Sequence, residues 1–227
     1  MLPTSLAYHT SRLCFRAFFR IRYGLQVTGA EFVPRRGGVV VACNHVSYLD
    51  PLPLAACCPR RLRFMARANL FDHWLLGPYL RSTGVMPLQR EERDVAALRL
   101  AIERLRRGEA VAIFPEGGRQ YSGQLGAAKR GVGLLAATAR VPIVPVLVQG
   151  TFEALPPDAS RLRRAKIRVA FGKPIPYTTG SVSPPGETVS SQRSSASVAP
   201  AREQHQVLAD AVTHQWHELL RQTRSNA

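Results

Sequence analysis

His45 and Asp50 stand five residues apart, shortly after the apolar run "VVVAC" that ends at Cys43. Histidine titrates near neutral pH, so it can take a proton from a reacting group such as a hydroxyl. A carboxylate beside the imidazole fixes its tautomer and stabilises the imidazolium that forms. The two residues therefore have the types and the spacing of a general base and its orienting partner.

Structural explanations of the same residues stay open. Asp50 stands before a proline, which is a good helix start with the aspartate as N-cap, and Ser47 can cap in the same way. Asn44 either bonds its own turn at the end of the strand or organises the site. Cys43 is two residues from His45 and so is a rival nucleophile, but its place in an apolar run favours the core.

A second polar segment, "FPEGGR", begins at Phe114 after another apolar run. Its proline and the glycines Gly117 and Gly118 predict a tight turn whose exposed backbone N–H groups suit an anion. Arg119 offers a planar fork for two hydrogen bonds to phosphate. Glu116 either belongs to the same site or is an acid that buttresses the arginine. Function gathers at the carboxyl ends of strands in open α/β sheets, so we expect both segments to line one cleft.

Four sequence blocks, in this order, resemble those of the glycerolipid acyltransferases of the lysophosphatidate acyltransferase type. The blocks are N-H-x-x-x-x-D at Asn44, His45 and Asp50; a glycine and an arginine six residues on, Gly84 and Arg90; "FPEGGRQ" from Phe114 to Gln120; and "VPIVPV" from Val141 to Val146. The resemblance covers about residues 25–176 and is specific because the blocks occur together.

The resemblance implies an O-acyltransferase that moves a fatty acyl group from acyl-CoA or acyl-carrier protein to the hydroxyl of a lysophospholipid. The implied acceptor is 1-acylglycerol 3-phosphate, which gives phosphatidate. His45 and Asp50 would then be the catalytic dyad. The chain has no G-x-S-x-G nucleophile elbow, which favours direct attack of the hydroxyl over an acyl-enzyme. We expect no cofactor and no metal.

The resemblance also implies a binding site for the acceptor phosphate. Glu116, Gly117 and Arg119 belong to it from the third block, and Arg90 contributes from the second. Lys129 is a further candidate for a phosphate contact. Arg90 and Lys129 can instead be solvated surface charges, which is the ordinary role of exposed basic residues.

Two positions depart from the family pattern. Gly118 stands where the family usually has threonine or serine, and Gln120 stands where it has serine. If the hydroxyls of those family residues bind the acceptor, this chain binds its acceptor through different contacts. Glycerol 3-phosphate and a lyso-aminolipid therefore stay open as acceptors, as do an inactive membrane-binding homologue and a thioesterase or lipase that uses His45 with water.

Alternating apolar strands and helices predict the scaffold that positions these residues. Over residues 25–177 they predict an α/β domain with a mixed, largely parallel central sheet flanked by helices. The resemblance implies the glycerol-3-phosphate acyltransferase-like fold for it. Within the domain we expect one strand at 61–67 and one helix over 69–84. Residues 178–202, rich in Ser and Pro, predict a flexible insertion, and 203–227 a terminal helix that packs on the domain.

The segment 1–24 contains no acidic residue and predicts a basic amphipathic helix. Its two faces carry Arg12, Arg16 and Arg20 on one side and Leu6, Leu13, Ala17 and Phe18 on the other. Such a helix either lies in a membrane interface or is docked on the domain with its arginines in water.

The composition of the chain limits the kinds of binding partner and the compartment that we expect. The 227 residues include 31 Lys and Arg against 15 Asp and Glu, a net charge of +16 that favours anionic lipids and phosphorylated substrates. Aromatic residues make up 7% and form no stacking motif, so nucleic acid is not expected. The four cysteines form no C-x-x-C, which fits a reducing compartment. We expect a cytoplasmic enzyme, peripherally associated with the anionic surface of the cytoplasmic membrane and without a transmembrane helix.

Overall fold

The computed structural model describes residues 4–88, 95–177 and 201–225. Eight strands form a six-stranded sheet, in the order β1-β8-β7-β2-β6-β3, and a two-stranded sheet of β4 and β5. The strands are β1 (Gln26–Thr28), β2 (Val39–Cys43), β3 (Leu62–Arg63), β4 (Met65–Arg67), β5 (Met86–Leu88), β6 (Ala110–Ile113), β7 (Ile143–Gln149) and β8 (Arg168–Phe171). Neighbouring strands are parallel except β7 and β8, so the predicted mixed, largely parallel sheet is confirmed.

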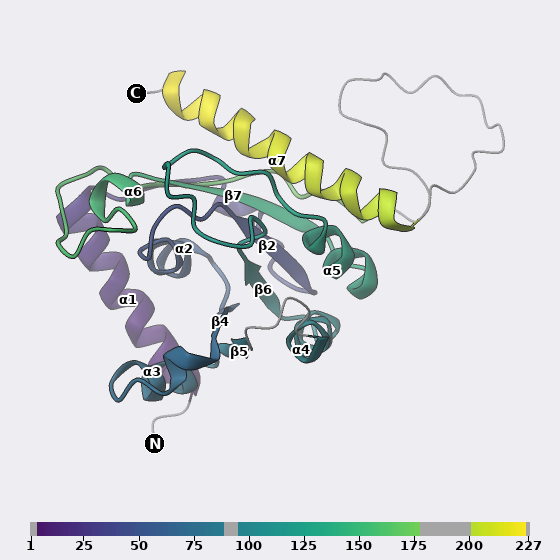
Figure 1. Cartoon of the computed structure of the whole chain (residues 1–227), viewed down its shortest axis with the longest axis horizontal. Helices are drawn as coiled ribbons and strands as arrows, with labels where there is room; N and C mark the ends of the chain where they lie inside the picture. The colour runs from purple at the N-terminus through teal and green to yellow at the C-terminus, as the bar shows by residue number, and fades with distance from the viewer. Residues whose placement is uncertain (1–3, 89–94, 178–200, 226–227) are drawn as a thin grey trace.

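Helices cover both faces of the large sheet (Figure 1). They are α1 (Thr4–Tyr23), α2 (Pro51–Cys57), α3 (Leu76–Thr83), α4 (Val95–Arg106), α5 (Gly131–Ala139), α6 (Thr151–Ala154) and α7 (Ala201–Ser225), with 3₁₀ turns η1 (Ala30–Phe32) and η2 (Ala68–Phe71). On one face lie α4, α5 and α7. On the other lies α2, which α1 contacts.

Strand β2 is buried on both faces, as its unbroken apolar sequence predicts for a parallel strand. Val40 faces the layer of α4, α5 and α7, and Val41 faces Leu54 of α2. Trp216 of α7 is fully buried, and its indole nitrogen donates to the carbonyl of Ala42 at 3.2 Å. Helix α7 therefore supports the end of β2, where the candidate site begins.

The helix expected over 69–84 is interrupted. Residues 68–71 form η2, and α3 begins only at Leu76. The reason lies in His73, whose Nδ1 accepts hydrogen bonds from the backbone amides of Leu75 and Leu76 at 3.3 and 3.2 Å, so a turn precedes the helix. The expected end is correct: Gly84 takes a left-handed φ of 76° at the C-cap.

The single strand expected at 61–67 is also divided, because β3 pairs with β6 in the large sheet while β4 pairs with β5 in the small one. Helix α5 starts at Gly131, so Lys129 lies in the loop before it. Of the predicted insertion 178–202, residues 178–200 lie outside the described residues, and the last two begin α7.

Candidate active site

His45 follows the carboxyl end of β2, and its Nδ1 lies 2.8 Å from Oδ2 of Asp50. Asp50 is fully buried, and the same oxygen accepts hydrogen bonds from the backbone amides of Val46 at 2.7 Å and Ser47 at 2.8 Å. We assign the proton of the His45 contact to Nδ1, because a carboxylate oxygen that accepts two amides is placed to accept a third donor. The Nε2 lone pair of His45 is then free to take a proton from a substrate.

The helix-cap explanation does not describe Asp50. Although it directly precedes α2, its carboxylate caps no amide of that helix and instead reaches back into the turn. Ser47 also serves the turn: its hydroxyl accepts from the amide of Leu49 at 3.1 Å and donates to the carbonyl of Leu155 at 2.6 Å. The buried hydroxyl and carboxylate thus hold the His45 turn in one conformation.

The loop after β6 lies against His45. The imidazole, whose side chain is 19% exposed, stacks on Phe114 with ring centroids 4.3 Å apart and an interplanar angle of 26°. The backbone amide of Gln120 donates to the carbonyl of His45 at 2.8 Å. Because β2 and β6 are parallel neighbours, their carboxyl ends meet at one edge of the sheet, and the two polar segments lie side by side there.

Asn44 bonds the neighbouring strand rather than its own turn. Its amide nitrogen donates to the carbonyl of Val148 at 3.0 Å, and its side-chain oxygen accepts from the Val148 amide at 2.7 Å. The side chain is buried, so it replaces a pair of backbone hydrogen bonds where β2 leaves the sheet. Asn44 therefore fixes the position from which the His45 turn starts.

Cys43 belongs to the core. Its side chain is fully buried against α2 and the apolar face of the sheet. Burial, followed by the negative charges of Asp50 and Glu116, raises the pKa of its thiol well above the ordinary value. A protonated thiol without solvent access is a poor nucleophile, so the rival explanation for Cys43 loses support.

The "PEGG" turn carries the features of an anion site. Gly117 has a φ of 79°, and a Cβ there would lie 2.6 Å from Nζ of Lys129, so the lysine side chain lies across the turn. The backbone amides of Gly118 and Arg119 donate to no other described residue. Unpaired amides and a nearby ammonium group are what a phosphate oxygen requires.

Arg119 stacks on an aromatic residue that the sequence reasoning missed. Its guanidinium carbon lies 3.5 Å from the ring centroid of Tyr48 and 5.7 Å from that of Tyr121. One terminal nitrogen, Nη1, is buried without a hydrogen-bond partner among the described residues. Tyr48 belongs to the turn between His45 and Asp50, and an aromatic residue inside that motif was the only sequence signal for it.

Glu116 is buried, and neither carboxylate oxygen has a hydrogen-bond partner among the described residues. Burial raises its pKa to about 7, and the nearby amides of His45 and Gly126 and the side chain of Gln120 oppose that rise in part. It forms no ion pair with Arg119 within the described chain, so the structure does not show the alternative role of Glu116 as a buttress of that arginine. Arg90 lies outside the described residues.

No group of three or more His, Cys, Asp or Glu residues in the described part of the chain is arranged to hold a metal ion. Across residues 4–88, 95–177 and 201–225, none of the helices has the length and apolar character needed to cross a membrane.

Known proteins are similar to this chain in sequence and in fold. The chain is 28% identical over 162 residues to the 1-acyl-sn-glycerol-3-phosphate acyltransferase of Bacillus subtilis (strain 168), a match that covers 70% of this chain and 78% of that protein. It is 31% identical over 157 residues to the chloroplastic 1-acyl-sn-glycerol-3-phosphate acyltransferase LPAT1 of Arabidopsis thaliana, covering 67% of this chain but only 44% of the plant protein.

A solved structure supports the fold independently. The crystal structure of the 1-acyl-sn-glycerophosphate (LPA) acyltransferase PlsC from Thermotoga maritima superposes with a TM-score of 0.67 and 23% identity, covering 95% of this chain and 79% of that one. The family model described as acyltransferase matches residues 24–149, more than half of the chain, and that span contains His45, Asp50 and the "PEGG" turn. The chain belongs to the acyltransferase family.

Proposed function

We propose that this enzyme transfers a fatty acyl group from acyl-CoA or acyl-carrier protein to the free hydroxyl of 1-acylglycerol 3-phosphate, giving phosphatidate. The observation that carries the proposal is the 2.8 Å contact between His45 and Asp50 beside a turn with unpaired amides and two cations. The names of the Bacillus and Arabidopsis relatives support the same acceptor.

The chemistry follows from the tautomer of His45. Its Nε2 takes the proton of the acceptor hydroxyl while the oxygen forms a bond to the thioester carbonyl carbon. The tetrahedral adduct then loses the thiolate, which takes the proton back from the imidazolium and leaves as a free thiol. Asp50 stabilises the imidazolium between these steps and does not itself gain the proton.

The acceptor phosphate would lie on the "PEGG" turn. Arg119 supplies a planar guanidinium that Tyr48 holds from one side, and Lys129 supplies a second charge over Gly117. Glu116 has a pKa of about 7, so near neutral pH it is protonated in a large fraction of molecules. A neutral carboxyl group does not repel the phosphate and can donate a hydrogen bond to it.

The acceptor headgroup is the part of the proposal with a specific rival. An added Cβ at Gly118 would meet nothing within 4 Å, so the missing hydroxyl of the family pattern leaves open space beside the turn. Glycerol 3-phosphate or a lyso-aminolipid would place different groups in the space beside Gly118 than lysophosphatidate does. Gly118→Thr should raise the preference for 1-acylglycerol 3-phosphate over these two acceptors, measured as the ratio of kcat/KM values.

We also propose that the enzyme acts at an anionic membrane surface on the cytoplasmic side. Helix α1 docks on the domain through Tyr8, Phe19 and Tyr23, which are buried. Its outward face remains apolar, with Leu13 68% exposed and Ile21 87% exposed. An outward apolar face beside exposed arginines is the pattern of a helix that lies in a bilayer interface.

The decisive experiment uses purified protein, an acyl thioester and a lysophosphatidate, with release of free thiol and formation of ester both measured. His45→Ala should lower kcat/KM by about 10²–10⁴-fold while the circular dichroism spectrum is retained. Asp50→Asn should lower it too, because the amide cannot stabilise the imidazolium. Undiminished ester formation by a folded His45→Ala variant would contradict the proposal, and thiol release with free fatty acid instead of ester would identify a thioesterase.

A further inference from the structure

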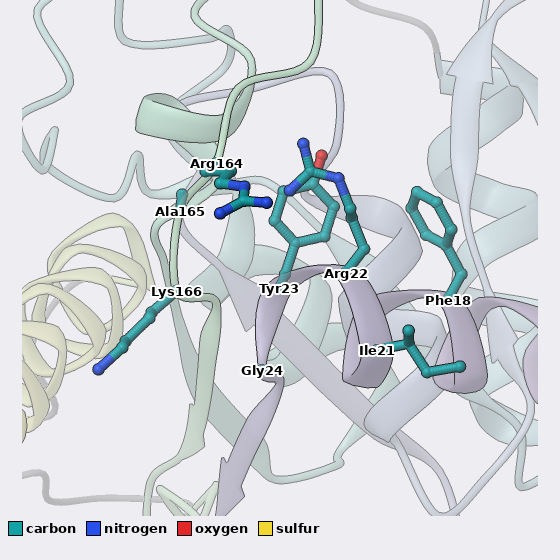
Figure 2. Close-up of a pocket in the computed structure, with 8 residues that line it drawn as sticks. All are labelled: Phe18, Ile21, Arg22, Tyr23, Gly24, Arg164, Ala165 and Lys166. Atoms are coloured by element: carbon teal, nitrogen blue, oxygen red, sulfur yellow. The ribbon is translucent and has the colours of Figure 1, made fainter.

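A surface pocket of about 950 Å³ lies where α1 ends. Eight residues line it, from the last turn of α1 and from the loop before β8: Phe18, Ile21, Arg22, Tyr23, Gly24, Arg164, Ala165 and Lys166 (Figure 2). None of them belongs to the candidate active site. The volume is at the upper end of the range of about 300–1,000 Å³ that is usual for small-molecule sites.

The pocket combines cations with apolar side chains. None of the eight lining residues is acidic, and none of its three basic residues forms an ion pair with another described residue. Figure 2 shows the guanidinium groups of Arg22 and Arg164 reaching toward the ring of Tyr23, whereas Lys166 points away from it. Two guanidinium groups without ion-pair partners in one pocket favour a ligand that carries a phosphate group over a purely apolar ligand.

Tyr23 gives an independent sign that a polar partner is missing. Its side chain is 2% exposed, and its hydroxyl is buried without a hydrogen-bond partner among the described residues. The guanidinium carbon of Arg22 lies 5.0 Å from its ring centroid. If an anion draws the Arg22 guanidinium away from the ring, it uncovers the hydroxyl, which can then donate to the same anion. Buried tyrosine hydroxyls usually have a partner, so this one is unusual.

The apolar residues of the pocket face the proposed bilayer. Ile21 lines the pocket and is also part of the outward apolar face of α1, and Phe18 is 43% exposed next to it. A ligand with a phosphate between Arg22 and Arg164 would therefore lay its apolar part along these two side chains. That division into a phosphate and a chain is the chemistry of a phospholipid.

The pocket is also connected to the catalytic turn through the core. Tyr23 packs in one buried cluster with Leu49, which lies in the turn between His45 and Asp50. The same cluster includes Ala154 and Ile167, and the Ile167 amide donates to the carbonyl of Tyr23 at 3.1 Å. A lipid held in the pocket would thus set the membrane surface at a fixed position relative to His45.

We propose that this pocket binds the phosphate headgroup of an anionic phospholipid of the membrane, as an anchoring site separate from the acceptor site at Arg119. The inference rests on the membrane association proposed above. It goes further in assigning the headgroup contact to Arg22 and Arg164 rather than to the net positive charge of the whole protein.

The test compares two double variants that lose the same charge. Arg22→Gln with Arg164→Gln removes the two guanidinium groups of the pocket and leaves Lys166, and Arg99→Gln with Arg221→Gln removes two exposed cations from α4 and α7. Full-length proteins are floated with phosphatidylcholine vesicles that contain or lack phosphatidylglycerol. The pocket pair should lower the partition coefficient on the anionic vesicles by about tenfold more than the control pair, and neither should change it on neutral vesicles. Thermal unfolding of all variants checks that each is folded.

Three results would overturn the assignment. The first is an equal loss in the pocket and control pairs, which would mean that only net charge matters. The second is wild-type binding to neutral vesicles as strong as to anionic ones. The third is loss of calorimetric binding of soluble glycerol 3-phosphate in the pocket variant with vesicle binding unchanged, which would identify a soluble phosphate ligand. Because flotation needs no turnover, failure of the acyltransferase assay leaves this test intact.

Discussion

The guanidinium carbon of Arg119 lies 3.5 Å from the ring centroid of Tyr48, and the two residues come from different loops at the same edge of the sheet. Tyr48 belongs to the turn that holds His45 and Asp50, while Arg119 closes the "PEGG" turn after β6. The contact therefore joins the proposed base to the proposed phosphate site. It also keeps the guanidinium plane in one orientation, which a bidentate contact with phosphate requires.

We predict that Tyr48→Ala raises the KM for a phosphate-bearing acceptor by about 3- to 30-fold, because a cation–π contact contributes roughly 0.5–2 kcal/mol. The value of kcat should change less, since the His45–Asp50 contact does not involve the ring. Tyr48→Phe is the matched control and should keep the wild-type KM, because phenylalanine retains the aromatic face. An equal rise in both variants would show that the hydroxyl, not the stacking, matters.

Because Glu116 is buried, we predict that the free energy of unfolding depends on pH. Its pKa is raised to about 7 in the folded protein by burial, above the ordinary value near 4.5. The folded state therefore disfavours the charged form, and this cost appears as pH rises from about 4.5 to about 7. Glu116→Gln should stabilise the protein by on the order of 2 kcal/mol above pH 7 and by little at pH 4, as measured by urea unfolding. An equal gain in the free energy of unfolding at both pH values would contradict the raised pKa of the Glu116 carboxyl group.

Much of the site was predictable because each polar segment is local. His45 and Asp50 are close in sequence, and the carboxyl ends of neighbouring parallel strands must share an edge, so the contact of the His45 turn with the loop after β6 followed from the pattern. The stacking of Tyr48 was not predictable, because it depends on the path of two loops. The same holds for Asn44, whose partner Val148 lies 104 residues later.

The fold, too, was predictable in some parts and not in others. The alternation of apolar strands and helices predicted the mixed sheet, since burial on both faces leaves a continuous apolar run such as β2. The break before α3 was missed because it depends on a histidine side chain that accepts two backbone amides, a use that periodicity does not reveal. Arg90 remains a prediction.

The Asn44 side chain should contribute substantially to the free energy of unfolding. Asn44→Ala would leave both the amide and the carbonyl of Val148 buried without partners, at a cost of about 1–3 kcal/mol each. Chemical denaturation should therefore show a loss of about 2–6 kcal/mol in the free energy of unfolding. Asn69→Ala, at an exposed position, is the control and should stay within about 0.5 kcal/mol of the wild type. Similar losses in the two variants would refute the proposed anchoring of β2.

The two glycines of the "PEGG" turn should respond differently to alanine. Gly117 has a φ of 79° and lies under Lys129, so Gly117→Ala should cost about 1–2 kcal/mol of stability and raise the acceptor KM by displacing the lysine. Gly118 has no positive φ and open space for a Cβ, so Gly118→Ala should be neutral for folding within about 0.5 kcal/mol. Unfolding curves and acceptor titrations of the pair decide the matter, and equal behaviour would disprove the turn geometry.

The outward face of α1 predicts how the enzyme reaches its substrate. Leu13 is 68% exposed on that face and lies outside the pocket beneath Arg22 and Arg164. Leu13→Glu would place a charge in the apolar interface, so vesicle flotation should fall by about tenfold or more on neutral and anionic vesicles alike. Val95→Glu introduces the same charge on α4, which lies on the opposite face of the sheet, and should reduce flotation far less. If both variants lose binding equally, net charge rather than the α1 face holds the protein on the membrane, because only the position of the new carboxylate differs between them.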